Sequence, residues 1–252
     1  MTTIDALLSS LEADAPVRHV LVGPFWTAVV LDAESSRCGL ASTLRAEDHP
    51  AGPPVPEAGR LLERTGRELA EWLRSSNALR ASIGMAAFNA LLEVDAAAFP
   101  EVNAREVILE RGAGRRIAVV GHFPFVDRVR DAAAECWVME MHPRPGDVPA
   151  GEADRVLPQA DVVALTGTSL INHTFDDLID LCRPDAFVLV LGPSAPLSPL
   201  LFNAGVDAIG GTVVTDPGRV LKLVGQGATF RQIKHAGGVH LLTLQRTKEK
   251  NG

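Results

Sequence analysis

The chain has 252 residues, 46% of them hydrophobic, and carries a formal net charge of −7. That length is enough for one large or two modest domains with hydrophobic cores. The acidic balance argues against a surface for nucleic acid or for an anionic membrane, because either would need clustered lysine and arginine. No uninterrupted apolar stretch approaches the roughly 20 residues of a membrane-spanning helix, and the acidic first residues lack the apolar core of a signal peptide. We therefore expect a cytoplasmic protein without nucleic-acid or membrane partners.

The first hundred residues show the patterns of a helix, three strands, a proline-rich loop and two further helices. In chain order these fall at residues 3–11, 17–23, 26–32, 37–43, 47–59, 61–73 and 78–92. The strands follow β-branched runs separated by turns, and the last two helices follow apolar residues at heptad-like spacing. The segment 99–111 is ambiguous and is interpreted as a link. These patterns predict a small α+β domain over residues 1–104.

From Arg115 onward, short apolar runs alternate with helix-sized segments. The runs are RRIAVVG, ECWVMEM, ADVVAL, AFVLVLG, VDAIGG and VHLLTL. This alternation predicts an α/β domain over residues 105–252 with a mostly parallel, Rossmann-like sheet covered on both faces. Three prolines are expected at first helical positions, namely Pro124, Pro199 and Pro217. Ser198 and Asp216 are the expected N-caps before the last two. In TFDD, Thr174 and Asp177 are expected to form a capping box.

Three loops that leave expected strands combine glycines or hydroxyls with a helix start. They are GHFPF, TGTSLINHT and GPSAPLSP, which begin at Gly121, Thr166 and Gly192. In an open parallel sheet, ligands bind beyond the carboxyl ends of the strands, where the strand order reverses. Glycines let the backbone approach a ligand, and free amides at helix starts favour anionic or carbonyl oxygens. We expect one pocket with these ligand-binding candidates: Gly121, His122, Phe123, Pro124, Thr166, Gly167, Thr168, Ser169, Asn172, Gly192, Pro193 and Ser194.

A nucleotide-type cofactor is one alternative. The GxGxxG fingerprint of dinucleotide binding is absent after the first strand of the second half. Glu140, however, follows Gly121 by nineteen residues, which is near the spacing of an acid that binds a ribose hydroxyl. An enzyme that uses adenosylmethionine or NAD therefore stays an alternative. Glu140 is also the best acid–base candidate by residue type.

A transition metal is the second alternative. Candidate ligands are Cys38, His122, Glu140 and His142, and the last two would share one face of a strand. Two ligands do not complete a site, and no CxxC or CxH spacing indicates structural zinc. The other two cysteines, Cys136 and Cys182, are expected in the core.

Nothing in the sequence indicates nucleophilic hydrolysis. The segment GTSLI does not match GxSxG, so whether a reaction follows binding is left open. Asn89 lies in an otherwise apolar helix, and a buried amide needs hydrogen-bond partners. It either ties down a loop or reaches a ligand from the first domain.

Several of these segments resemble one bacterial and archaeal family, described as the "putative heavy-metal chelation domain". The resemblance is carried by GHFPF, ADVVALTGTSLINHT, LGPSAPLSPLLF, AGVDAIGG, CGLAST and FNALL. It implies an enolase-N-terminal-like α+β domain, a Rossmann-like domain and an active site between them. The residues that it carries over are Cys38, Asn89, Gly121, Phe123, Pro124, Thr166, Gly167, Thr168, Asn172, Gly192, Pro193 and Ser194. This chain departs from the expected pattern at Ser169 and Ala195, where threonines are usual.

The leading hypothesis is a two-domain protein that binds a small polar or anionic molecule between its domains, with a metal chelate as one candidate. Clefts at domain boundaries are favoured ligand sites. The three loops would supply hydrogen bonds, while Cys38 and Asn89 approach from the first domain. A homodimer is expected only because two-fold dimers are the commonest oligomers.

Overall fold

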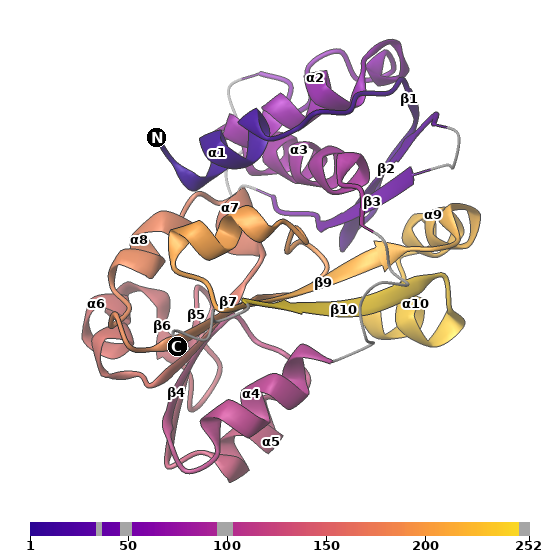
Figure 1. Cartoon of the computed structure of the whole chain (residues 1–252). Helices are drawn as coiled ribbons and strands as arrows, with labels where there is room; N and C mark the ends of the chain where they lie inside the picture. The colour runs from indigo at the N-terminus through magenta and orange to yellow at the C-terminus, as the bar shows by residue number, and fades with distance from the viewer. Residues whose placement is uncertain (34–36, 46–51, 95–102, 247–252) are drawn as a thin grey trace, which may run out of the picture.

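The computed structural model describes residues 1–33, 37–45, 52–94 and 103–246 of the chain (Figure 1). An N-terminal unit contains a three-stranded antiparallel sheet with helices. A C-terminal unit contains a seven-stranded, mostly parallel sheet. This arrangement confirms the predicted α/β fold class. Within the described residues, no helix has both the length and the apolar character needed to cross a bilayer.

The N-terminal unit follows the predicted order of elements. They are α1 (Thr3–Ser9), β1 (Val17–Val22), β2 (Trp26–Leu31), β3 (Arg37–Ser42), η1 (Leu61–Glu63), α2 (Gly66–Ala70), η2 (Glu71–Arg74) and α3 (Ala78–Leu91). The helix predicted over 61–73 is instead three short pieces. The break occurs at Thr65, whose backbone is extended and whose hydroxyl accepts the Glu68 N–H as an N-cap.

Helix α3 is buried along most of its length because small residues allow close packing on two sides. A Cβ atom on Gly39 of β3 would lie 2.0 Å from the Ala86 carbonyl oxygen of α3. A Cβ atom on Gly84 would lie 2.2 Å from the Leu73 nitrogen of η2. The first contact places α3 directly on the three-stranded sheet and the second places it against η2, and a larger side chain at either glycine would separate the elements.

The C-terminal unit alternates strands and helices. Its elements are α4 (Ala104–Gly112), β4 (Arg116–Val120), α5 (Val126–Ala132), β5 (Glu135–Glu140), β6 (Val148–Pro149), η4 (Ala150–Glu152), α6 (Ala153–Val156), η5 (Leu157–Gln159), β7 (Val162–Thr166), α7 (Thr168–Ile171), α8 (Phe175–Asp180), β8 (Phe187–Leu191), η6 (Pro199–Ala204), β9 (Ala208–Val214), α9 (Pro217–Gly225), α10 (Phe230–Ala236) and β10 (Val239–Gln245). The short edge strand β6 was not predicted.

The strand order is β10-β9-β8-β7-β4-β5-β6, and every neighbouring pair is parallel except β10 with β9. The chain leaves β4 toward β5 on one side and returns to β7 on the other. The order therefore reverses between β4 and β7, which is where an open parallel sheet forms a crevice.

Some predicted helix starts differ from the structure. Pro217 is the first residue of α9, and the Asp216 carboxylate accepts the Arg219 N–H at 2.9 Å as predicted. Helix α5 begins only at Val126, so Pro124 precedes it. Thr174 does not cap α8, because its hydroxyl donates to the Asn172 side chain.

Pro199 begins the 3-10 helix η6 as the prediction placed it. Ser198 occupies the position before it, but its side chain makes no capping hydrogen bond. The predicted N-cap at Ser198 is therefore wrong, whereas the proline is correctly placed.

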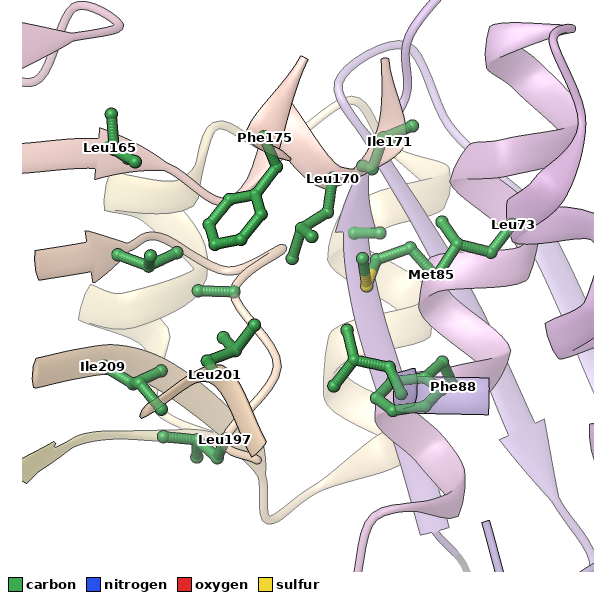
Figure 2. Close-up of a cluster of buried hydrophobic side chains, with 14 of the residues drawn as sticks. Leu73, Met85, Phe88, Leu165, Leu170, Ile171, Phe175, Leu197, Leu201 and Ile209 are labelled. Atoms are coloured by element: carbon green, nitrogen blue, oxygen red, sulfur yellow. The ribbon is translucent and has the colours of Figure 1, made fainter. Parts of the chain in front are cut away.

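One hydrophobic core runs through both units. Figure 2 shows Met85 and Phe88 of α3 on the right, facing Leu170 of α7, Phe175 and Leu201 to their left, and all five side chains are buried. The opposite face of the three-stranded sheet packs on α9, α10 and β10 through a separate apolar cluster. Both faces of this small sheet are therefore covered, which fixes the N-terminal unit against the parallel sheet (Figure 1).

Candidate binding cleft

A cleft of about 760 Å³ opens at the point where the strand order reverses. Its walls come from the loops after β4, β7 and β8, from β9 and β10, from the starts of α4 and α10, and from the three-stranded sheet. The lining residues are Trp26, Ser42, Asn103, Ala104, Arg105, His122, Phe123, Pro124, Phe125, Thr166, Gly167, Thr168, Leu191, Gly192, Pro193, Ser194, Gly210, Gly211, Thr212, Thr229, Phe230, Arg231, Lys234, Leu241, Leu242 and Thr243.

The three loops singled out in the sequence meet at this cleft. Nine of the twelve loop residues predicted to bind a ligand line it, namely His122, Phe123, Pro124, Thr166, Gly167, Thr168, Gly192, Pro193 and Ser194. They converge because β4, β7 and β8 run parallel and end at the same edge of the sheet. That these residues bind a ligand stays a prediction.

Thr166, the last residue of β7, and Thr168, the first residue of α7, form a hydroxyl pair at the cleft. The Thr166 and Thr168 side-chain oxygens lie 3.0 Å apart, and Thr166 Oγ1 also accepts the Thr168 N–H at 3.3 Å. Each hydroxyl carries one hydrogen, and the pair uses only one of the two between them. The second hydrogen makes no hydrogen bond within the described part of the chain.

Two glycines hold the loops in backbone conformations that other residues rarely adopt. Gly121 after β4 has φ +101°, and Gly192 after β8 has φ +113°. Gly167 has an ordinary φ, but a Cβ atom there would lie 2.4 Å from the Ala195 nitrogen. The loops after β7 and β8 therefore touch through their backbones, which keeps Thr168 and Ser194 at one end of the cleft.

Ser194 links the two units at the cleft. Its Oγ accepts the Ser42 backbone N–H at 2.8 Å and lies 3.1 Å from the Ser42 hydroxyl. Ser194 is buried, and both serines line the cleft. The sequence predicted Ser194 but not Ser42, which stands at the end of β3 in the segment CGLAST.

His122 lies beside a buried carboxylate. The Asp147 side chain is 1% exposed, pairs with Arg130 at 2.9 Å and accepts the Arg144 N–H at 3.1 Å. His122 Nε2 is 3.9 Å from Asp147 Oδ2, and its Nδ1 is 3.4 Å from Arg144 Nη1. Because an arginine can only donate, Nδ1 is the acceptor in this contact.

Helix α10 and the three-stranded sheet contribute lining residues that the sequence did not predict. Trp26 of β2 contacts Phe230 of α10 with ring centroids 5.4 Å apart. Arg231 and Lys234 follow on the same helix. Their spacing of three residues was visible in the sequence, but nothing there placed α10 beside the loops of β4 and β7. The Trp26 indole nitrogen and the Thr212 hydroxyl are covered and have no hydrogen-bond partner among the described residues.

The remaining binding candidates of the C-terminal unit lie outside the lining. Gly121 stands behind Thr166, and its own Cβ would meet that side chain at 3.0 Å. Ser169 is buried and donates to the Thr166 carbonyl at 2.7 Å. Asn172 accepts from the Thr174 hydroxyl at 2.8 Å. Each of these three residues therefore packs or hydrogen-bonds within the loops that carry the lining residues.

Cys38 and Asn89 of the N-terminal unit also lie outside the lining. Asn89 donates to the Leu40 carbonyl at 3.0 Å and so ties α3 to β3, while its Oδ1 is covered and has no partner within the described ranges. Cys38 is buried between the small sheet and α9, and burial raises the pKa of its thiol to about 12. The expected approach of these two residues to the cleft does not occur.

The acidic and metal candidates after β5 are not brought into the cleft. Glu140 is the last residue of β5 and accepts the N–H of Met141 at 3.2 Å, so His142 lies beyond the strand. The predicted shared strand face for Glu140 and His142 is wrong. Among the described residues, no three His, Cys, Asp or Glu side chains gather as they would around a metal ion. The nucleotide alternative depended on Glu140 reaching the ligand, and Glu140 is not part of the lining.

The fold and the cleft define an α/β protein with a candidate small-molecule site at the switch point of a Rossmann-like sheet. Two family models match the chain, and both are described as "Putative heavy-metal chelation". DUF4213 covers residues 4–92, and DUF364 covers residues 103–243. The chain therefore belongs to the DUF364 family, and the resemblance noted in the loop sequences is confirmed.

Solved structures and one curated relative agree with this assignment. A DUF364 protein of unknown function from Desulfitobacterium hafniense is 26% identical, with a TM-score of 0.78 over 96% of this chain and 97% of its own. One from Pyrococcus horikoshii has a TM-score of 0.82 at 20% identity, covering 97% and 98% of the two chains, which shows the common fold. An uncharacterized protein of Methanocaldococcus jannaschii is 30% identical over 125 residues, which are 47% of this chain. The match spans 48% of that relative, or about half its length.

Proposed function

We propose that the protein binds a small polar or anionic molecule in the cleft between its two sheets, with a metal chelate among the ligands that suit the site. One observation carries this proposal: three strand-end loops and Ser42 of the N-terminal unit line a single cleft of about 760 Å³. A hollow of this size at a switch point suits a molecule larger than a single ion.

The polar groups of the loops give the cleft its hydrogen-bonding capacity. The Thr166–Thr168 pair has one hydroxyl hydrogen that it does not use internally. On the neighbouring loop, Ser194 is held in place by its hydrogen bonds with Ser42. Because these groups are fixed before a ligand arrives, little side-chain entropy is lost when it binds.

The family description names heavy-metal chelation. The side chains of the cleft that could coordinate a metal indicate how a metal would be held. Among the described lining residues there is no Asp, Glu or Cys, and His122 is the single common metal ligand. A bare divalent ion needs several such donors. A metal already held by an organic chelator would instead be bound through the outer polar groups of the chelator, which the loop hydroxyls suit.

The first experiment identifies whatever the protein carries. The purified protein is denatured, and the released small molecules and metals are measured by mass spectrometry against a mock purification. The captured molecule is then titrated calorimetrically into wild-type protein, Thr168→Val and the control Thr215→Val, an exposed threonine outside the lining. We expect Thr168→Val to fold normally and lose affinity, while the control binds as wild type.

The result is checked by thermal unfolding. A ligand present at 100 times its Kd adds about 2.7 kcal/mol to the free energy of unfolding, and this gain should disappear in Thr168→Val. The proposal fails if no small molecule is captured or if Thr168→Val binds the captured molecule as tightly as wild type.

A further inference from the structure

Helix α10 turns one aromatic and two cationic side chains toward the cleft. It begins with a capping box, in which the Gln232 side chain accepts the Thr229 N–H at 2.9 Å, and it is anchored by the buried Ile233. Phe230 and Lys234 are four residues apart and Arg231 and Lys234 three apart, so they share one face of the helix. All three line the cleft.

The charge of this lining is opposite to that of the whole chain. Its charged side chains are Arg105, Arg231 and Lys234, with no carboxylate among the described lining residues, whereas the formal net charge of the protein is −7. Arg105 pairs with the neighbouring Glu106. Arg231 and Lys234 form no ion pair or side-chain hydrogen bond with the described part of the chain. By contrast, most described arginines outside the cleft form such contacts.

Flat apolar surfaces accompany these two cations. The Trp26 and Phe230 rings contact each other at an interplanar angle of 54°, and Phe123 and Phe125 are stacked with centroids 5.2 Å apart. All four aromatic residues line the cleft. Apolar walls lower the local dielectric constant and so strengthen the attraction between a cation and a bound anion.

We propose that Trp26, Phe230, Arg231 and Lys234 form an acid-binding subsite, called here the α10 subsite, for a ligand with a carboxylate or phosphate group on a flat or apolar body. The inference rests on the proposed function, because it assigns a further part of the lining of the same cleft. The threonine and serine loops would contact other polar groups of the ligand, and Arg231 and Lys234 would bind its acid group.

Simple probes test the chemistry without knowledge of the natural ligand. Phenyl phosphate and benzoate have both an aromatic body and an acid group. Inorganic phosphate and acetate have only the acid, and benzyl alcohol has only the ring. The Trp26 indole N–H signal, assigned by its loss in Trp26→Phe, reports binding by NMR, because Trp72 and Trp137 are not in the lining.

We expect phenyl phosphate or benzoate to shift the Trp26 signal in a saturable way, at least about tenfold more tightly than the acid-only and ring-only probes. A preference between the two identifies phosphate or carboxylate as the acid. Binding should weaken as salt concentration rises, since ion attraction is screened. No saturable shift with either aromatic acid, or equal binding of benzyl alcohol, would overturn the subsite.

Paired variants separate the subsite from general charge effects. The test variant removes both cations of the subsite, by Arg231→Gln together with Lys234→Gln. The control variant removes one exposed arginine and one exposed lysine outside the lining, by Arg128→Gln together with Lys222→Gln. Both double variants have the same net charge. We expect the first to bind the aromatic acid about tenfold more weakly and the second to bind it as wild type does.

The same titration with Thr168→Val distinguishes the two proposals. Normal binding by the α10 double variant, with weakened binding by Thr168→Val, overturns the α10 subsite and leaves the loop site standing. The reverse pattern supports the subsite, and the loop hydroxyls are then tested with the captured molecule, because the aromatic acids have no further polar group for them to contact. Full binding of the aromatic acid by the α10 double variant overturns the subsite.

Discussion

The Ser42 backbone N–H donates to the Ser194 hydroxyl oxygen over 2.8 Å, although 152 residues separate the two in the chain. Ser42 ends β3 of the small sheet, and Ser194 follows β8 of the parallel sheet. The bond joins the units at the edge of the cleft, beside the core that they share. Cleft geometry and the packing of the two units are therefore coupled.

Ser194→Ala should destabilise the protein because it leaves the Ser42 N–H without its acceptor. We expect a loss of about 1 kcal/mol in the free energy of unfolding, measured by urea denaturation. Ser9→Ala, at an exposed site on α1, is the matched control and should be nearly neutral. Equal stability of the two variants would mean that the Ser42–Ser194 bond contributes nothing to the joining of the units.

Gly192→Ala tests the backbone of the loop after β8. The nearest atom to a Cβ there is 3.9 Å away, so space is available, but φ is +113°. A residue with a side chain rarely adopts this conformation, and we expect a loss of about 1–3 kcal/mol. Gly151→Ala is the control, because its φ is not positive and no atom lies within 4 Å of the added Cβ. A fully stable Gly192→Ala protein would show that the loop relaxes to another conformation.

The sequence predicted the fold well where one local signal decided the structure. The central residues of β4, β7 and β8 are buried and β-branched or apolar, which is the pattern of central parallel strands. The sequence pattern gave wrong predictions where local side-chain hydrogen bonds competed with the expected helix or helix cap. Thr65 interrupts an apparently continuous helix, and Thr174 bonds to Asn172 instead of capping α8.

The candidate site was predictable only for the segments that end at one edge of the sheet. Strand ends carry their loops to the same place by topology, so GHFPF, TGTSL and GPS could be placed together from the sequence. Trp26, Arg231 and Lys234 reach the cleft through the packing of the small sheet on α9 and α10. That packing depends on long-range contacts with no local signal. Cys38 is part of the same packing, which explains why it is buried there and absent from the cleft.

Cys38 should make stability depend on pH in the alkaline range. Burial raises the pKa of this thiol to about 12 in the folded protein, against about 8.5 in an unfolded chain. The unfolded state therefore loses its proton first, so the contribution is complete below about pH 8.5 and declines as pH rises toward the folded value. The chain has no tyrosine, which leaves the cysteines as the main side chains that titrate there below the lysines.

The measurement is the free energy of unfolding in urea between pH 8 and pH 10 for wild type and Cys38→Ala. We expect it to fall with pH in both, but less steeply in the variant. Burial also raises the pKa values of the Cys136 and Cys182 thiols, to about 11. These two thiols therefore keep part of the pH dependence of stability in the variant. Identical slopes would mean that the Cys38 thiol ionises in the folded protein as easily as in the unfolded chain.

Asp161 should support the fold at neutral pH without affecting the cleft. It immediately precedes β7, at the strand end opposite Thr166. Hydrogen bonds from Arg116, through its side chain and its backbone N–H, hold the pKa of this carboxyl well below its usual range, with a further bond from Arg183. The stabilisation is complete above the unfolded pKa of about 3.9 and is lost as pH falls through the lower folded value.

Asp161→Asn should therefore be less stable than wild type at pH 7, with the difference shrinking below about pH 4. Urea unfolding across this range measures the difference. The control is Asp131→Asn, at an exposed site whose side chain has no partner in the described part of the chain. Binding of the aromatic acid probe at pH 7 should be unchanged in both variants, because Asp161 is not in the lining. A constant stability difference down to pH 2 would contradict the lowered pKa. Lost probe binding would show that the two ends of β7 are coupled.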